Sequence, residues 1–258
     1  MITPLVATRG DSLATARAQL DRAKLVLCDV DGCLVESDAL CPGAAAFVAQ
    51  HGERLRLVTN NSTMTAAAFS TYLDTLGLEV PAARCFLAGE VALAHVRDHH
   101  PNTTILIAAS PAIRQRAEAL GLHLAGSKPD VVVLCNDPTL DIERLQQIVT
   151  AAHSGAPVIV ANPDRWRPDR GGAPLIETGT ILAALRAAVT NANITIVGKP
   201  SREMFHRALE DVAPADAVMI GDNRETDIIG AETLGIAAIH IGRSREAIAA
   251  HLLDLMTW

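Results

Sequence analysis

Two aspartates lie two positions apart at the end of an apolar run, in the stretch LVLCDVDGCL at 25–34. Side chains at positions i and i+2 of a strand point the same way, so Asp29 and Asp31 would leave the strand end side by side. Gly32 then lets the chain turn sharply. Carboxylates this close repel each other, and a hard cation removes the conflict. Mg²⁺ is the usual cation at oxygen-only sites that handle phosphate. The alternative for this stretch is an ordinary Asp-rich turn.

Further polar groups follow three other apolar runs. Thr59 and Asn60 end the run at 54–59, and Lys199 and Asp222 come just after the runs at 194–197 and 217–220. Ligands of open α/β sheets bind outside the carboxyl ends of the strands, so these groups are predicted to meet at one sheet edge. Phosphoryl transfer needs such parts: a metal to bridge an oxygen, a cation for the equatorial charge and an in-line nucleophile.

The residue types suggest individual roles. Asp29 is the predicted nucleophile, because an aspartate is ionised at neutral pH and can form an acyl phosphate. Asp31 could protonate the leaving oxygen and later deprotonate water. Asp222 would hold Mg²⁺ together with Asp29, and Asp227 could orient a metal-bound water. Taken singly, the partners of Asp29 have plainer explanations: a solvated lysine, turn residues, or a favourable charge at a helix N-terminus.

The elements that must position these residues alternate along the chain. Apolar runs expected to be strands occur at 25–28, 54–59, 104–109, 131–134, 158–161, 194–197, 217–220 and 237–241. Helical patterns separate them, among them 65–76, 111–120, 178–190, 201–211 and 226–234, and loops are expected at 35–40 and 162–172. This alternation predicts an α/β fold with a Rossmann-like, mainly parallel sheet. The segment 101–175 has its own strand–helix rhythm and is predicted to be an inserted α/β cap domain.

Composition narrows the class of protein. Of 258 residues, 49% are hydrophobic and 20% are charged, so the chain is globular with ample length for a core. A net charge of −7, scarce aromatics and no Lys/Arg-rich block argue against nucleic acid as a partner. Five cysteines without a CxxC pair indicate reduced, mostly buried thiols of a cytoplasmic protein. Neither a secretory leader nor a bilayer-spanning run is seen, so no membrane association is expected.

Four motifs, in this order, resemble the phosphatase branch of the haloacid dehalogenase-like superfamily. They are DVDG at 29–32, TNNS at 59–62, GKP at 198–200 and GDNRETD at 221–227. The insertion after the second motif, with ANPD at 161–164 and GTILAAL at 179–185, is similar to that of the NagD-like or p-nitrophenylphosphatase-type subfamily. That subfamily carries a large α/β cap. The resemblance runs from about residue 21 to the end of the sequence.

The resemblance implies Mg²⁺-dependent hydrolysis of a phosphate monoester through an aspartyl phosphate. It makes Asp29 the nucleophile and a metal ligand, and Asp31 the acid/base with its backbone carbonyl on the metal. Thr59 and Asn60 would hold the phosphoryl oxygens, and Lys199 would neutralise the intermediate. Asp222, the first aspartate of the fourth motif, would be the remaining protein ligand of the metal. The implied division is a catalytic core at 1–100 plus 176–258 and an inserted cap at 101–175.

The cap contains a basic stretch that is predicted to set substrate specificity. Its candidate residues are Asn162, Asp164, Arg165, Trp166 and Arg167. Either arginine could reach a carboxylate or second anionic group of the substrate, and Trp166 offers a flat face. The alternative is a solvated loop with one packed Trp.

Two acidic residues, Glu36 and Asp38, follow the first motif where relatives usually have an aromatic residue and a glycine. They argue against a highly anionic substrate such as a bisphosphate. Sugar phosphates, nucleoside monophosphates, phosphoglycolate and pyridoxal phosphate stay open as substrates. A phosphotransferase or mutase on the same scaffold, and a non-catalytic binding protein, stay open as functions. A homodimer is expected by analogy with the subfamily.

Overall fold

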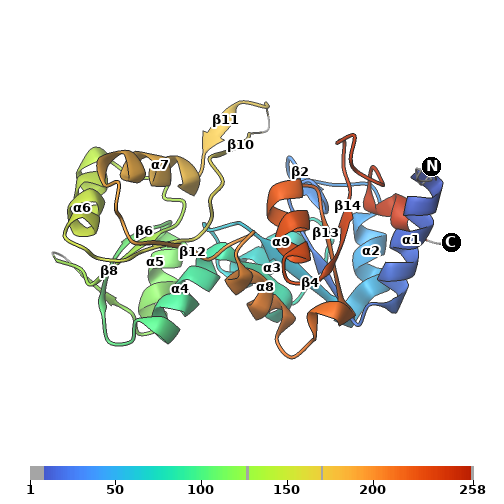
Figure 1. The fold of residues 1–258 in the computed structure, drawn as a ribbon, viewed down its shortest axis with the longest axis horizontal. Helices are drawn as coiled ribbons and strands as arrows, with labels where there is room; N and C mark the ends of the chain where they lie inside the picture. Colours follow the sequence, from blue (N-terminus) through green and yellow to red (C-terminus); the bar gives the residue numbers. More distant parts are fainter. Residues whose placement is uncertain (1–8, 126–127, 170, 257–258) are drawn as a thin grey trace, which may run out of the picture. The chain divides into compact units, whose positions relative to one another are not determined.

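The computed structural model describes residues 9–125, 128–169 and 171–256. The chain divides into two compact units. The first contains Met1–Val58, Leu73–Val80 and Ala208–Trp258, and the second contains Thr59–Tyr72 and Pro81–Arg207. Two five-stranded sheets organise the fold, and helices accompany both (Figure 1). Their strands pair in parallel, which confirms the predicted α/β fold.

Strand β1 is central in the first sheet, whose order is β14-β13-β1-β4-β5. The strands are β1 (Leu25–Cys28), β4 (Leu55–Thr59), β5 (Cys85–Leu87), β13 (Ala217–Gly221) and β14 (Ala237–His240). All of β1 is buried, as expected of a parallel strand covered on both faces. The register places Cys28 opposite Ile220 on one side and Leu57 on the other. The carboxyl ends of β1, β13 and β4 therefore lie at the same edge of the sheet.

The first described helix and the last described turn of the first unit pack against each other. Its helical elements are α1 (Arg9–Arg22), α2 (Ala44–His51), α9 (Ile229–Glu232), and the 3₁₀ turns η1 (Gly52–Arg54), η3 (Pro214–Asp216) and η5 (Leu252–Leu255). Arg17 of α1 donates to the carbonyl of Asp254 at 2.7 Å, and α1, α2 and η5 lie together (Figure 1). Gly43, with φ 86°, precedes α2, and a Cβ there would lie 2.5 Å from the backbone nitrogen of Leu253. Only glycine allows this close approach.

The polar loop predicted at 35–40 is in fact a β-hairpin. Strands β2 (Val35–Glu36) and β3 (Ala39–Leu40) pair antiparallel around Ser37 and Asp38. Both turn residues have positive φ, 52° and 61°. A two-residue hairpin turn of the primed type requires this backbone conformation, and Asp tolerates it better than most residues. The hairpin was missed because its strands are too short to show an alternating pattern.

The helix predicted at 226–234 begins with a π-helical turn. This turn, η4, spans Arg224–Ile228 and leads into α9. The side chain of Asn223 accepts hydrogen bonds from the backbone nitrogens of Glu225 and Thr226, at 3.0 and 3.3 Å. Capping therefore starts the helical region earlier than the apolar periodicity indicated.

The second sheet lies in the second unit, in the order β12-β9-β8-β6-β7 (Figure 1). Its strands are β6 (Thr104–Ala108), β7 (His123–Leu124), β8 (Val131–Leu134), β9 (Val158–Val160) and β12 (Ile194–Ile196). Helices α6 (Ile142–His153) and α7 (Thr178–Ala188) cover one face, and α4 (Ala88–His99) and α5 (Pro111–Ala119) the other (Figure 1). Alternate strand residues such as Leu106, Val132 and Val158 pack with Ile148 and Leu185 in one buried cluster. The strict alternation follows from the pleat of the strands.

Helix α7 and strand β12 follow residue 175 in the sequence, but β12 is a strand of the second sheet and α7 packs on that sheet. Leu182 and Leu185 of α7 lie in its buried cluster, and Ile194 of β12 pairs with Val158 of β9. The division into a core at 1–100 plus 176–258 and a cap at 101–175 stays a prediction.

The remaining elements are α3 (Ala66–Thr75), α8 (Arg202–Leu209), the 3₁₀ turn η2 (Ala82–Arg84), β10 (Trp166–Pro168) and β11 (Pro174–Ile176). The predicted loop at 162–172 contains most of a second hairpin, because β10 pairs antiparallel with β11. Asp169 closes its turn: Oδ1 accepts from the backbone nitrogens of Gly171 and Ala173, at 2.7 and 2.8 Å. Proline at a strand end is compatible with such an edge ribbon, although it obscures the strand pattern.

All five cysteines are buried, and none of them forms a disulfide. Burial raises the pKa of Cys135 to about 12, so this thiol is neutral at physiological pH. Within the described ranges, no helix is both long enough and apolar enough to cross a membrane.

Candidate active site

The first group of predicted site residues lies in the first unit, at the carboxyl ends of β1 and β13. Asp29 follows β1 and is 5% exposed, while Asp222 follows β13 and is exposed. A carboxylate oxygen of each and the sulfur of Cys33 all lie within 4.8 Å of one another. The sheet register therefore brings together the two aspartates that the sequence placed almost two hundred positions apart.

Gly32 makes the close approach of these carboxylates possible. It adopts φ 78°, and a Cβ at this position would overlap the carboxylate of Asp222. Any side chain at position 32 would push Asp222 away from the end of β1. The cluster offers two carboxylates at short range in a partly buried setting, which is a donor set that a hard, oxygen-seeking dication fits. Asp29 and Asp222 are thus suited to hold a metal such as Mg²⁺.

Cys33 was not singled out in the sequence, where it lies four positions after Asp29. Burial raises its pKa well above the usual value, and the nearby charge of Asp29 raises it further. A hard cation such as Mg²⁺ binds oxygen in preference to sulfur. The oxygens of Asp29 and Asp222 are therefore the donors that remain for a cation.

Asp227 supports the loop that carries Asp222. It is fully buried, and its Oδ2 accepts from the backbone nitrogen of Asn223 at 3.1 Å. A Cβ on Gly221 would overlap the Asp227 side chain, so the strand end and this aspartate are in close contact. Asp227 lies inside the π-helical turn rather than at the start of a regular helix.

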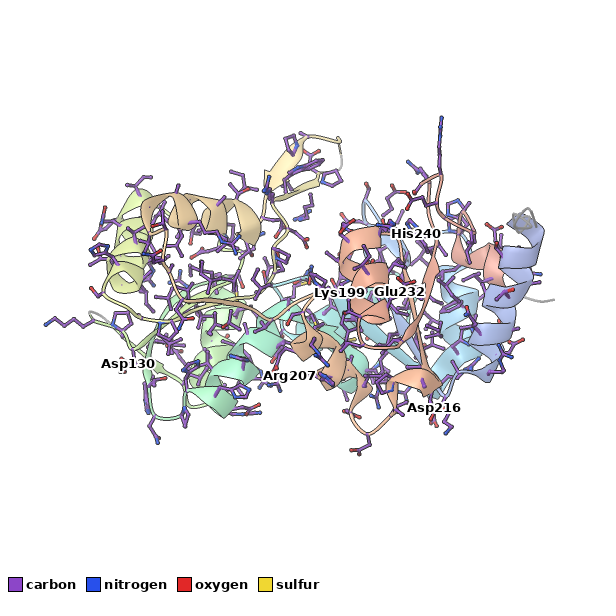
Figure 2. The ribbon with its side chains drawn as sticks, in the orientation of Figure 1. Asp130, Lys199, Arg207, Asp216, Glu232 and His240 are labelled. Carbon is purple, nitrogen blue, oxygen red and sulfur yellow. The ribbon has the colours of Figure 1, made fainter. Side chains whose placement is uncertain are left out.

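His240 also contacts the loop that carries Asp222. It ends β14, is 9% exposed, and its Nε2 lies 3.0 Å from the carbonyl oxygen of Asp222 (Figure 2). The sequence analysis did not select His240. The sequence feature that could have identified His240 is its position at the end of the last strand, before Gly242.

The second group lies in the second unit and centres on Asn60. Its Nδ2 donates to Asp164 Oδ2 at 2.9 Å and to the carbonyl of Lys199 at 3.1 Å. Both amide hydrogens are thereby used. A phosphoryl contact by Asn60 would consequently have to come from its backbone N–H. Asn162 joins the group by donating from Nδ2 to the Asn60 carbonyl at 2.7 Å.

Ser62 is buried and connects three residues of the second unit that are far apart in the sequence. Its Oγ accepts from the backbone nitrogen of Asn136 at 2.9 Å and lies 3.4 Å from Thr178 Oγ1 and from Asn162 Nδ2. Asn136 and Thr178 were not predicted as site residues, and no local pattern marks them. Asn162 and Asp164 therefore fix the shape of the 59–62 loop, whatever else they contact.

Lys199 lies on the loop between β12 and α8 and is 2% exposed (Figure 2). The alternative of a solvated lysine is therefore wrong. Thr59 ends β4, is 1% exposed, and accepts from the backbone nitrogen of Asn61 through Oγ1 at 3.1 Å. Asp31 is exposed, as suits a group that exchanges protons with a leaving group and with water.

The basic stretch of the cap lies on hairpin β10–β11. Arg167 Nε contacts Glu177 Oε1 at 2.9 Å, so the carboxylate that this arginine reaches belongs to the chain itself. Burial raises the pKa of Glu177, although its hydrogen bond with Arg167 opposes the shift. Trp166 is 60% exposed and pairs across the hairpin with Ile176, which is 63% exposed. The alternative of a packed Trp is wrong, and Trp166 and Arg165 present their side chains on the surface.

Comparison with known proteins agrees with this fold. Residues 26–123 match a family described as haloacid dehalogenase-like hydrolases, and residues 196–252 match a second hydrolase family of the same type. Together the two matches cover more than half of the chain. The fold and these matches thus define a hydrolase of the haloacid dehalogenase-like class.

Relatives that cover most of the chain narrow this class. A dihydroxyacetone phosphatase of Corynebacterium glutamicum is 28% identical, covering 83% of this chain and 78% of the relative. A glycerol-3-phosphate phosphatase of Gallus gallus is 29% identical, covering 87% and 81%. The crystal structure of a 4-nitrophenylphosphatase from Thermotoga maritima superposes with a TM-score of 0.81 at 28% identity, covering 88% and 90%. The chain belongs to the haloacid dehalogenase-like hydrolases, in the NagD/p-nitrophenylphosphatase-type subfamily, and is a phosphatase.

Proposed function

We propose that this phosphatase hydrolyses a small phosphate monoester in a Mg²⁺-dependent reaction through an aspartyl phosphate on Asp29. The observation that supports this most is the cluster of Asp29 and Asp222 around Gly32, at the end of the central strand. Two neighbouring carboxylates repel a phosphate anion. A bound cation is therefore needed before the phosphate can approach the buried carboxylate that attacks it. The family to which the chain belongs typically uses a divalent metal.

The proposed reaction has two steps. An oxygen of Asp29 attacks the phosphorus, and the bond from phosphorus to the ester oxygen breaks as Asp31 gives that oxygen a proton. Water then attacks the phosphorus of the aspartyl phosphate while Asp31 takes its proton, which releases phosphate and restores Asp29. Lys199 would balance the charge of the phosphoryl group, and Thr59 would donate a hydrogen bond to it.

Asp29, Asp222 and the backbone carbonyl of Asp31 are the proposed ligands of Mg²⁺. The bound cation would offset the negative charge of the phosphoryl oxygens and of the two aspartates. Asp227 and His240 are proposed to keep Asp222 in place, since each bonds to the loop that carries it. A solved relative, the glycerol phosphate phosphatase of Mycobacterium tuberculosis, was crystallised with calcium; it is 25% identical, covers 92% of this chain, and has a TM-score of 0.80.

The proposed substrate is a phosphorylated three-carbon compound or a small sugar phosphate. Relatives over most of the chain are a dihydroxyacetone phosphatase, a glycerol-3-phosphate phosphatase and an acid sugar phosphatase. Glu36 of the β2–β3 hairpin pairs with Arg243 at 3.1 Å, which partly offsets the acidic charge near the first motif. The predictions of a homodimer, of no nucleic-acid partner and of no membrane association remain open to test.

Removing the divalent metal is expected to stop phosphate release, and Mg²⁺ is expected to restore it. Replacing Asp222 with Asn should raise the Mg²⁺ concentration for half-maximal rate at least about tenfold, because one charged ligand is lost while the side-chain shape is kept. The measurement is release of free phosphate from p-nitrophenyl phosphate and glycerol phosphate across a Mg²⁺ titration. Detecting free phosphate also separates hydrolysis from transfer to another acceptor.

Glu225→Gln is the matched control for Asp222→Asn, because Glu225 is exposed in the π-helical turn just after Asp222 and lies outside the carboxylate cluster. It should leave the Mg²⁺ requirement within about twofold of the wild type. A metal-independent rate in chelated wild-type protein, or an unchanged Mg²⁺ requirement in the Asp222 variant, would contradict the proposed function.

Hairpin β10–β11 is proposed to influence which phosphate esters are accepted. Trp166→Ala should change the relative kcat/KM values across a panel of glycerol, sugar and nucleoside phosphates by about three- to tenfold, because a flat exposed face is lost. Ile142→Ala is the control, since Ile142 is also an exposed apolar residue of the second unit but lies on α6. An unchanged substrate ranking in Trp166→Ala would show that the hairpin is only a surface ribbon.

A further inference from the structure

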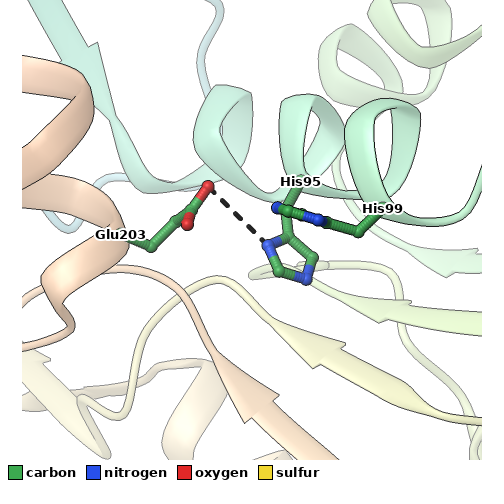
Figure 3. Close-up of side chains that lie close together, drawn as sticks. All are labelled: His95, His99 and Glu203. Carbon is green, nitrogen blue, oxygen red and sulfur yellow. Dashed lines mark ion pairs between the residues drawn. The ribbon is translucent and has the colours of Figure 1, made fainter. Parts of the chain in front are cut away.

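A group of metal-binding side chains in the second unit takes no part in the proposed reaction. His95 and His99 lie one turn apart on α4, and Glu203 lies in the first turn of α8 (Figure 3). Side chains four positions apart share one face of a helix, so both imidazoles project toward the same region. Figure 3 shows the carboxylate of Glu203 directed at the ring of His95, with the ring of His99 alongside.

The distances within this group suit a shared ion. One nitrogen of each histidine and one oxygen of Glu203 all lie within 4.8 Å of one another. The ring centroids of His95 and His99 are 4.4 Å apart, and His95 Nδ1 lies 3.7 Å from Glu203 Oε1. Two imidazole nitrogens and one carboxylate oxygen, from two helices, are a three-ligand set typical of transition-metal sites.

His95 also has an unsatisfied nitrogen on the side that faces Glu203. Its Nδ1 is buried and has no hydrogen-bond partner among the residues that the structure describes. A buried polar atom without a partner requires an explanation such as a bound ion.

Glu203 is held in place by a partner that leaves one oxygen available. Arg207 contacts Oε1 of Glu203 through Nε at 2.8 Å and through Nη2 at 2.7 Å. The same guanidinium contacts Asp98 Oδ2 at 2.9 Å, which fixes its orientation. Such outer contacts orient carboxylate ligands in metal sites. Both contacts reach Oε1, and neither uses Oε2.

We propose that His95, His99 and Glu203 form a binding site for a Zn²⁺-class transition-metal ion that links α4 to α8. Imidazole nitrogens favour such ions over Mg²⁺, so this site is chemically distinct from the carboxylate pair of Asp29 and Asp222. The proposal does not depend on the proposed function. Because α8 directly follows the loop of Lys199, an ion here would anchor that loop to α4.

The test is a Zn²⁺ titration of chelator-treated, full-length protein in excess Mg²⁺, in competition with a chromogenic zinc chelator. The wild type should bind one Zn²⁺ per chain, and His99→Ala should bind it at least about tenfold more weakly because a ligand is missing. His99 is exposed and ends its helix, so this substitution leaves the core packing intact. His153→Ala is the matched control, since His153 is an exposed histidine at the end of α6. It should bind Zn²⁺ as the wild type does.

Three further measurements separate this site from the carboxylate cluster. Asp222→Asn should retain Zn²⁺ binding, and the electron paramagnetic resonance spectrum of bound Cu²⁺ should show nitrogen coupling that weakens in His99→Ala. Thermal melting with Zn²⁺ should raise Tm in the wild type and not in His99→Ala. Equal Zn²⁺ affinity in the wild type and His99→Ala, or loss of binding only in Asp222→Asn, would overturn the proposal. In that case the three side chains form an ion-pair network only.

Discussion

Asp29→Asn is expected to lower phosphate release at least about a thousandfold while leaving the fold intact. Asparagine has the shape of aspartate, but its amide cannot attack phosphorus and carries no negative charge for a metal. The measurement is phosphate release at saturating Mg²⁺, together with a far-ultraviolet circular dichroism spectrum.

A trapping experiment tests the role of Asp29 more directly. Acid quenching during turnover should yield phosphorylated wild-type protein, with the label on the peptide that contains Asp29, and none in Asp29→Asn. Asp38→Asn is the matched control: Asp38 is exposed in the β2–β3 turn at φ 61°, a conformation that asparagine also tolerates. It should retain the wild-type rate within about threefold. Release that survives Asp29→Asn would mean that another group is the nucleophile.

Lys199→Met is expected to lower kcat about a hundred- to a thousandfold, the range found when one charge-stabilising group is removed from an active site. Methionine retains much of the apolar stem of lysine but lacks the charge that would offset the phosphoryl oxygens. The effect should fall on kcat more than on KM, because negative charge at the reacting oxygens must be stabilised in the transition state. Steady-state kinetics with p-nitrophenyl phosphate and glycerol phosphate measure both constants.

The control for this substitution is Lys24→Met. The Lys24 side chain is 72% exposed and pairs with Asp216 at 2.9 Å on the surface. Exposed pairs contribute little to stability, so this variant should keep its rate within about twofold and its Tm within a few degrees. Lys199→Met must be shown by thermal melting to be folded, since it empties a buried position. A folded Lys199→Met variant with near-normal kcat would remove Lys199 from the proposed mechanism.

The chemistry of the first group of site residues, which contains Asp29 and Asp222, was largely predictable from the sequence. Asp29 and Asp222 each follow an apolar run, and parallel strands deliver their carboxyl ends to one edge. Their proximity in the structure agrees with that inference. The long strands and helices were predictable for the same reason, because a repeated pattern over many residues averages out local exceptions. Short elements such as β2 and β10 carry too few residues for such a pattern.

Contacts between distant loops were beyond prediction. His240 meets the carbonyl of Asp222 only because β14 pairs with β13. Asn60 uses its amide on Asp164, more than a hundred positions away, and on the Lys199 carbonyl. The family resemblance suggested Asn60 as a direct phosphate ligand, whereas in the structure its side-chain amide donates to Asp164 and to the Lys199 carbonyl. Nothing local in the sequence distinguishes a side chain that binds a ligand from one that braces a loop.

The sequence by itself determined the α/β class, the four motifs and the residue types available for phosphoryl transfer. These follow from local properties: apolar periodicity, strand-end position and the fixed chemistry of carboxylates and lysine. Only the tertiary structure decided that Lys199 is buried, that Trp166 is exposed on a hairpin, and that His95 and His99 lie beside Glu203. Burial and long-range proximity depend on how whole layers pack. That packing is set by many weak contacts at once, and no single stretch of the chain encodes it.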